Sequence, residues 1–190
     1  MKLHYMGKYD LNPESLPCNT HMRGAVPFKE AKDMKEMAKI MSILSVIMLL
    51  VFGFILYLRY SNSFIEYILV GSIFALLSLF PHELLHAICF KEDVYLYTNF
   101  KQGMLFVVGT ETMSKGRFIF MSLLPNLIFG IIPFGIGLIW PSLSILGAFG
   151  VLSISMGAGD YYNIFNALTQ MPGGSRTYLY QFSSYWYMPD

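Results

Sequence analysis

The chain has 190 residues, of which 55% are hydrophobic and 13% are charged, and its mean hydropathy is +0.50. Soluble domains carry about 25% charged residues, so this composition excludes an ordinary soluble domain and is typical of an integral membrane protein. The formal net charge of +1 excludes a general nucleic-acid-binding surface, and two cysteines exclude a disulfide framework. The length suits one compact bundle of a few helices.

Residues 1–28 are predicted to form a cytoplasmic arm. Proline and glycine recur among Asn and Ser residues here, so the stretch has no regular hydrophobic period and is typical of turns. His4, Cys18 and His21 lie in this arm, but their spacings match no zinc pattern. We interpret them as solvated loop residues.

Four stretches after the arm are long and apolar enough to cross a hydrocarbon core of about 30 Å as helices. The predicted spans are residues 36–60, 64–90, 117–140 and 142–168. Between the second and third spans, residues 94–110 contain two runs of β-branched and aromatic residues, which predict a β-hairpin. Because an open sheet edge cannot face lipid, we expect this hairpin at the membrane surface.

We therefore predict an α-helical membrane protein with four transmembrane helices and a small β-hairpin insert between the second and third spans. Residues 29–190 would form a single membrane-embedded domain after the arm. Of the 13 basic residues, seven lie in the amino-terminal segment up to Lys39, one at the first loop (Arg59), four at the second (Lys91, Lys101, Lys115 and Arg117), none at the third, and one in the tail (Arg176). Under the positive-inside rule this distribution predicts that both termini are cytoplasmic.

The second predicted span contains His82-Glu83-Leu84-Leu85-His86, which has the H-E-x-x-H pattern. On a helix, His82 and His86 lie one turn apart on the same face, so both imidazoles can bind one ion, and the pattern predicts a zinc site. Glu83 lies roughly 100° around the helix, where it can act as a base toward water. The alternative is two ordinary helix-face histidines, which an apolar span disfavours. Pro81 is expected to kink the helix, either to admit water or only for packing.

Asp160 in the fourth span is the predicted third zinc ligand. Measured from the cytoplasmic ends of their spans, His82, Asn126 and Asp160 lie at a similar depth of about 12–14 Å. An unpaired carboxylate at that depth costs a few kcal/mol, and no Lys or Arg in the span pairs with Asp160. A zinc ion bound by His82, His86 and Asp160 would compensate this charge. Glu111 in the hairpin is the alternative third ligand.

Two asparagines in the predicted spans are candidates for substrate binding or for orienting a ligand. Asn126 lies in the third span and Asn163 in the fourth. The alternative for each is an interhelical hydrogen bond, which we favour over a catalytic role for either one alone.

The chain resembles the site-2 protease class of intramembrane zinc metalloproteases, and more closely a compact bacterial membrane family labelled putative zincin peptidase. The resemblance rests on residues 82–86, on Leu124-Pro125-Asn126 and on Gly159-Asp160-Tyr161-Tyr162-Asn163. It implies that His82, His86 and Asp160 are zinc ligands and that Glu83 is the catalytic base. In site-2 proteases the aspartate is usually followed by glycine, whereas here Tyr161 follows it, and the chain has no PDZ-like domain.

The expected function is zinc-dependent hydrolysis of peptide bonds in a membrane-associated substrate near the cytoplasmic face of a bacterial plasma membrane. An extended substrate could add as a strand to the edge of the hairpin at residues 94–110. The expected partners are the lipid bilayer and a membrane protein or peptide substrate, without nucleic acid. Alternatives are a membrane metal-binding or transport protein and a non-catalytic protease relative that acts as an interaction module.

Overall fold

The computed structural model describes residues 1–181 and 183–189. Contacts within the chain divide it into two compact units. The first, which we call the sheet unit, comprises Met1–Glu30, Glu83–Met121 and Ile164–Asp190. The second, which we call the helical unit, comprises Ala31–His82 and Ser122–Asn163.

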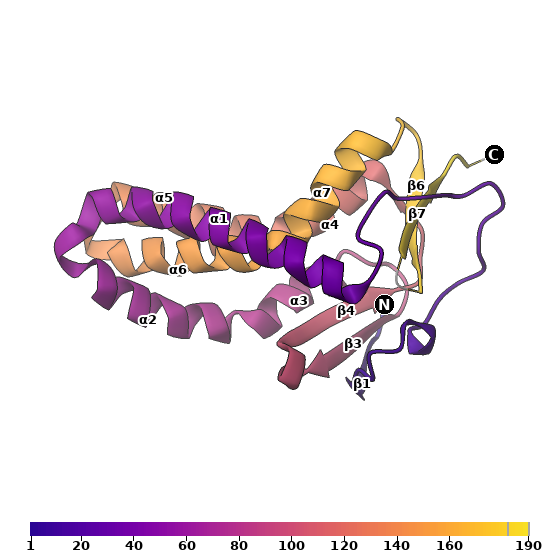
Figure 1. The fold of residues 1–190 in the computed structure, drawn as a ribbon, viewed down its shortest axis with the longest axis horizontal. Helices are drawn as coiled ribbons and strands as arrows, with labels where there is room; N and C mark the ends of the chain where they lie inside the picture. Colours follow the sequence, from indigo (N-terminus) through magenta and orange to yellow (C-terminus); the bar gives the residue numbers. More distant parts are fainter. Residues whose placement is uncertain (182, 190) are drawn as a thin grey trace. The chain divides into compact units, whose positions relative to one another are not determined.

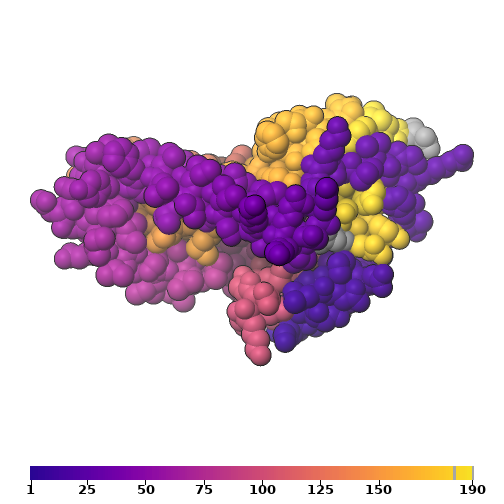
Figure 2. All heavy atoms as spheres, in the orientation of Figure 1, coloured from indigo at the N-terminus to yellow at the C-terminus, as the bar shows by residue number. Residues whose placement is uncertain are grey.

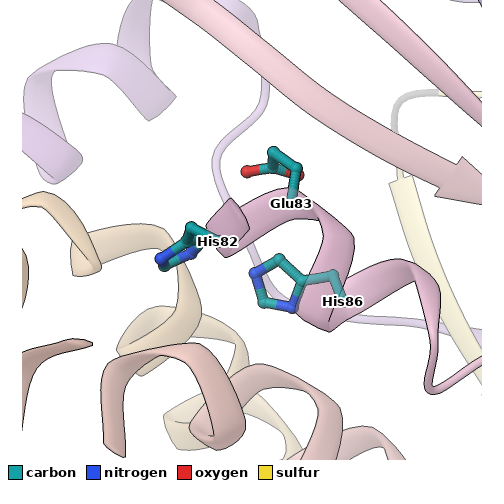
Figure 3. A group of neighbouring side chains, drawn as sticks. All are labelled: His82, Glu83 and His86. Carbon is teal, nitrogen blue, oxygen red and sulfur yellow. The ribbon is translucent and has the colours of Figure 1, made fainter. Parts of the chain in front are cut away.

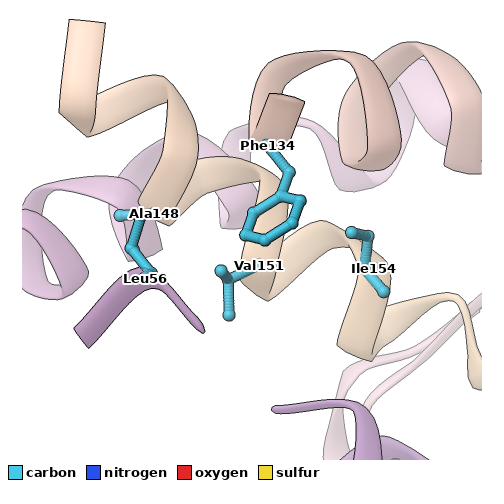
Figure 4. Close-up of a cluster of buried hydrophobic side chains, with 5 residues drawn as sticks. All are labelled: Leu56, Phe134, Ala148, Val151 and Ile154. Carbon is cyan, nitrogen blue, oxygen red and sulfur yellow. The ribbon is translucent and has the colours of Figure 1, made fainter. Parts of the chain in front are cut away.

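The helical unit is built around α6, which packs against α1, α2 and α5 (Figure 1). Five buried apolar side chains form its core (Figure 4): Leu56, Phe134, Ala148, Val151 and Ile154. The helices that lie wholly or partly in this unit are α1 (Met34–Tyr60), α2 (Phe64–Leu77), α3 (Leu79–Ala87), α4 (Lys115–Pro125), the π-helical turn Asn126–Ile131, α5 (Ile132–Ile139), α6 (Ser144–Met156) and α7 (Ala158–Gln170). Short 3₁₀ turns lie at Ser61–Ser63 and Pro141–Leu143.

Glycines allow α6 to approach its neighbours closely. A Cβ on Gly137 of α5 would lie 2.2 Å from the backbone nitrogen of Gly147, and a Cβ on Gly150 would lie 2.3 Å from that of Phe134. Small residues at such crossings let backbones pack directly against each other, as in membrane helix pairs. The glycines of α5 and α6 therefore allow close contact between these two helices.

Large apolar side chains cover the outer side of α1. Figure 2 shows the residues of α1 at the surface of the molecule, and the apolar side chains of α1 that are more than half exposed include Val46, Ile47, Leu50, Val51, Phe54 and Leu58. In a water-soluble unit such a surface would normally be buried against a partner. It is the surface expected of a helix that lies in lipid.

The break between α2 and α3 lies where Pro81 predicts it. Proline has no N–H to bond the carbonyl four residues earlier, and its ring clashes with that carbonyl, which belongs to Leu77. Helix α2 ends at Leu77, and α3 begins at Leu79. Between them, the Ser78 hydroxyl donates to the carbonyl oxygen of Ala75 at 2.8 Å. The metal-binding pattern is thus carried on a separate helix of nine residues.

The sheet unit contains two small sheets. The first has the strand order β1-β3-β4, with β1 (Leu3–Lys8) parallel to β3 (Val94–Asn99) and β3 antiparallel to β4 (Met104–Gly109). Leu96 of β3 pairs with Val107 of β4, so the predicted hairpin is present. The second sheet has the order β2-β7-β6-β5 and is formed by β2 (Val26–Pro27), β5 (Met113–Ser114), β6 (Arg176–Tyr180) and β7 (Ser183–Tyr187). Turns of 3₁₀ helix lie at Pro13–Ser15 and Phe100–Gln102.

The predicted fold class of four transmembrane helices with one small hairpin is wrong. Within the described residues, two helical stretches are long and apolar enough to cross a membrane, Met34–Leu77 and Lys115–Ile139. A third is added if the pair Pro141–Met156 and Ala158–Gln170, bent by 56°, counts as one span. The predicted second span fails because Pro81 divides it into α2 of 14 residues and α3 of nine, each too short to cross alone. The two sheets replace the single hairpin, because strands form in the arm and in the carboxy-terminal tail as well.

Candidate metal centre

Helix α3 carries three metal-binding side chains on neighbouring turns (Figure 3). One ligand atom from each of His82, Glu83 and His86 lies within 4.8 Å of the corresponding atoms of the other two. The spacing of four residues places both imidazoles on one side of the helix, as the sequence predicts. His86 is 8% exposed, and His82 and Glu83 are half-buried.

Asp160 lies against His82 within the helical unit. Its Oδ2 is 3.1 Å from Nε2 of His82, and the two side chains are 13% and 18% exposed. The Asn126 amide nitrogen donates to the same Oδ2 at 2.7 Å and to the carbonyl oxygen of Ser122 at 3.1 Å. Asn126 is 1% exposed and begins the π-helical turn after Pro125. The amide is therefore held rigidly against the carboxylate that it orients.

Gly157 makes room for this asparagine. A Cβ at position 157 would lie 1.7 Å from Oδ1 of Asn126, far inside contact distance. Its backbone φ is −77°, which any residue can adopt, so the requirement for glycine is steric and not conformational. The sequence Gly157-Ala158-Gly159 before Asp160 carries this signal, although sequence reasoning did not assign it a role.

The chemistry of these side chains, and the spacing of His82 and Asp160 within the helical unit, fit a zinc ion. Two ligands of a tetrahedral zinc with bonds of about 2.0 Å are separated by about 3.3 Å. The distance of 3.1 Å between His82 Nε2 and Asp160 Oδ2 is close to that separation. Two imidazoles and one carboxylate form one of the usual three-residue ligand sets of catalytic zinc.

His86 is oriented by a backbone carbonyl within the sheet unit. Its Nδ1 lies 3.0 Å from the carbonyl oxygen of Met121 in α4. A carbonyl oxygen can only accept, so Nδ1 carries the proton and Nε2 has the lone pair that can bind a metal. The sequence does not predict a role for Met121, because the acceptor is its backbone carbonyl oxygen, which every residue has.

Glu83 is anchored to the edge of the first sheet. The backbone N–H of Val107 donates to Glu83 Oε2 at 3.0 Å. This N–H therefore points away from β3, and β4 is an edge strand. The hydrogen bond orients the carboxylate. The sequence predicts a hairpin edge near the site, but not this contact.

Glu111, the alternative third ligand, is engaged elsewhere in the sheet unit. Its Oε1 lies 2.5 Å from Nη1 of Arg117, and its Oε2 accepts the backbone N–H groups of Lys91 and Glu92, each at 2.6 Å. Burial raises the pKa of the Glu111 carboxyl, but the two amides and the guanidinium outweigh it and hold the pKa below its ordinary value. Glu111 is thus an ionised structural acceptor.

The remaining predicted residues lie as follows. Asn163 is half-buried on α7, three residues after Asp160, and its role stays a prediction. In the arm, His4 pairs with Asp93 at 2.9 Å, and His21 Nδ1 lies 3.0 Å from the hydroxyl of Tyr178. His21 is exposed and lies in a loop, as predicted, whereas His4 lies in β1 and is half-buried. Both histidines belong to the sheet unit and not to the group on α3.

Comparison with known proteins links this site to one family. The family model described as putative zincin peptidase matches residues 74–176, which is more than half of the chain and contains α3, Asn126 and Asp160. No curated protein and no solved structure matches the chain. The relation to site-2 proteases therefore stays a prediction.

Proposed function

Because the chain belongs to the family described as putative zincin peptidase, we propose that it is a zinc-dependent metallopeptidase with α3 as its catalytic helix. The observation that carries the proposal is the group formed by His82, Glu83 and His86 on that helix. Two imidazoles one turn apart with an adjacent glutamate provide both the ligands and the base that this chemistry needs.

We propose His82, His86 and Asp160 as the zinc ligands. Support comes from the 3.1 Å contact between His82 and Asp160 and from the Nδ1 hydrogen bond that fixes the tautomer of His86. A zinc ion held by these residues would acidify water toward a pKa of about 7 and polarise the carbonyl of a peptide bond. Asn126 would hold Asp160 in place during the reaction.

Glu83 is the proposed general base. It would take the proton of the attacking water and pass it to the nitrogen of the leaving amine. The hydrogen bond from the Val107 N–H orients this carboxylate. The substrate peptide would add in an extended conformation along the free edge of β4, where backbone groups can pair with it.

The proposed substrate is a membrane-associated peptide segment near the cytoplasmic face of a bacterial plasma membrane. The apolar helices support a membrane location. Seven of the 13 basic residues precede the apolar part of α1, which supports a cytoplasmic amino terminus. Strand β2 pairs with β7, so both terminal segments belong to the sheet unit and would lie on the same side.

The test is a comparison of zinc content and cleavage in the full-length protein purified in detergent. Wild-type protein is expected to hold one zinc and to cleave fluorescently labelled casein, used as an unfolded-protein probe. Glu83→Gln should keep zinc and lose about 10²–10⁴-fold in rate, whereas His86→Ala should lose both. His4→Ala, outside the metal-binding group, is the control and should retain both.

Three results would contradict the proposal. If wild-type protein holds no stoichiometric zinc, the metal centre is wrong. If it holds zinc but Glu83→Gln cleaves at the wild-type rate, Glu83 is not the base. If it holds zinc and cleaves nothing, a metal-binding or transport role becomes the better explanation.

A further inference from the structure

The chain segment that follows α3 is fastened at three backbone groups by two side chains. Glu111 accepts the N–H groups of Lys91 and Glu92 with one carboxylate oxygen. Arg117 donates to the carbonyl oxygen of Cys89 through Nε at 2.9 Å and also through Nη2. The two side chains bind each other through Glu111 Oε1 and Arg117 Nη1. Together they hold the carboxy-terminal end of the metal-binding helix.

The same contacts attach α3 to α4. Arg117 lies in the first turn of α4, and Met121, whose carbonyl oxygen accepts from His86, lies one turn later. On the other side, the contacted residues are His86 in α3 and Cys89, which lies two residues past the end of α3 at Ala87. One contact on the helix and one just beyond its carboxy-terminal end constrain both the separation of α3 from α4 and the rotation of α3 about its axis.

Strand β4 and the residues after it provide a second line of contacts along α3. Val107 binds Glu83, a Cβ on Gly109 would lie 2.1 Å from the Phe90 ring, and Glu111 binds the Lys91 amide. These contacts recur at every second residue of the extended chain. The part of β4 that precedes Val107 lies outside this line of contacts.

We propose that Glu111 and Arg117 are positioning residues of the metal centre, which set the rotation of α3 and thereby aim His86 and Glu83. This inference rests on the proposed function. Glu111 is 7% exposed, and its carboxylate binds the Lys91 and Glu92 amides and Arg117. It would therefore act on the metal centre only through the segment that follows α3. A side chain that orients ligands in this way typically changes metal affinity by about 10–100-fold when it is replaced.

The test uses Glu111→Gln and Arg117→Lys in full-length protein in detergent. Zn²⁺ affinity is measured by competition with a fluorescent chelator, and the ligand geometry by the visible absorption of the Co²⁺-substituted protein. We expect Glu111→Gln to weaken zinc binding by about 10–100-fold and to alter the cobalt spectrum. Arg117→Lys keeps the charge but loses the fork that binds Cys89, so it should weaken zinc binding by at least about threefold.

Asp93→Asn is the matched control. Asp93 also accepts a backbone N–H, that of Lys2, and pairs with a basic ring, that of His4, in the same unit. It is exposed and holds no part of α3, so zinc affinity and the cobalt spectrum should not change. Hydrogen exchange of residues 84–92 in metal-free protein adds a readout that needs no metal, and Glu111→Gln should accelerate it about tenfold or more.

The outcomes separate this inference from the proposed function. If wild-type protein binds zinc and both variants bind it with wild-type affinity and spectrum, the positioning role is overturned, even if the variants melt earlier. If Glu111→Gln does not fold, Arg117→Lys decides in the same way. If wild-type protein binds no zinc, the proposed function fails, and unchanged exchange at residues 84–92 would overturn the positioning role independently.

Discussion

Replacement of Gly157 by alanine is the sharpest test of how Asp160 is held. At a φ of −77° alanine is conformationally acceptable, and on backbone grounds alone it should stabilise the protein by about 0.4–1 kcal/mol. The added Cβ, however, would lie 1.7 Å from Oδ1 and 2.6 Å from Cγ of Asn126. The asparagine must therefore move, and its 2.7 Å hydrogen bond to Asp160 must break.

The expected loss of stability follows from these two effects. Overpacking of a tight site costs about 1–3 kcal/mol, and loss of a hydrogen bond to a charged group costs about 1.5–3 kcal/mol. After subtraction of the backbone gain, we expect a net destabilisation of about 3 kcal/mol. Because Asp160 loses its orienting amide, zinc affinity should also fall by about tenfold or more.

The assay is thermal unfolding in detergent together with zinc competition. Gly159→Ala is the matched control, since a Cβ there would meet only the Met41 sulfur at an ordinary 3.7 Å. In an Asn126→Ala background the clash partner is gone, so Gly157→Ala should cost little more than the control. If Gly157→Ala alone behaves like Gly159→Ala, the packing of Asn126 between Gly157 and Asp160 is refuted.

Three further predictions concern acid stability, thiol reactivity and the helix break. Because the pKa of Glu111 is held below its ordinary value, its contribution to stability is complete above about pH 4.3 and is lost as pH falls through the folded-state pKa. The difference in melting temperature between wild type and Glu111→Gln should therefore shrink as pH falls from about 6 to about 3. A constant difference would contradict this. Burial raises the pKa of the half-buried Cys89 thiol, whereas Cys18 is exposed. Iodoacetamide should therefore modify Cys18 at least about tenfold faster than Cys89 at neutral pH, as measured by mass spectrometry. Equal rates would argue against the burial of Cys89. Pro81→Ala restores an N–H that can donate to the carbonyl oxygen of Leu77. The melting temperature should rise, because a penalty of up to about 3 kcal/mol is removed, and zinc affinity should fall, because α3 joins α2. Unchanged zinc affinity would show that the helix break serves only packing.

The sequence predicts those parts of the fold that depend on local pattern. The apolar runs form helices, and the hairpin forms where β-branched and aromatic residues flank Lys101-Gln102-Gly103. Strand β1 is not predicted, because it forms only by pairing with β3, about 90 residues away in the sequence, and a local pattern does not reveal that pairing. In the carboxy-terminal tail, tyrosines alternate at positions 178 and 180 and at 185 and 187, as expected of the two strands that they form.

The candidate site divides in the same way. His82, Glu83 and His86 are found from spacing, and Asp160 from its apolar surroundings, because both signals are carried by side chains. Glu111 competes with Asp160 at the level of sequence, since only the folded chain shows that Arg117 and two amides engage its carboxylate. The number of spans was overestimated because hydrophobicity does not reveal that Pro81 interrupts the helix.

The acceptor that orients His86 has a consequence for evolution. Since it is the carbonyl oxygen of Met121, any residue that keeps α4 helical supplies the same atom. Natural selection can therefore preserve the orientation of a ligand while the identity of residue 121 drifts. Among family members, variability at this position would coexist with a constant role, and a search based on invariant residues would overlook one of the atoms on which the metal centre depends.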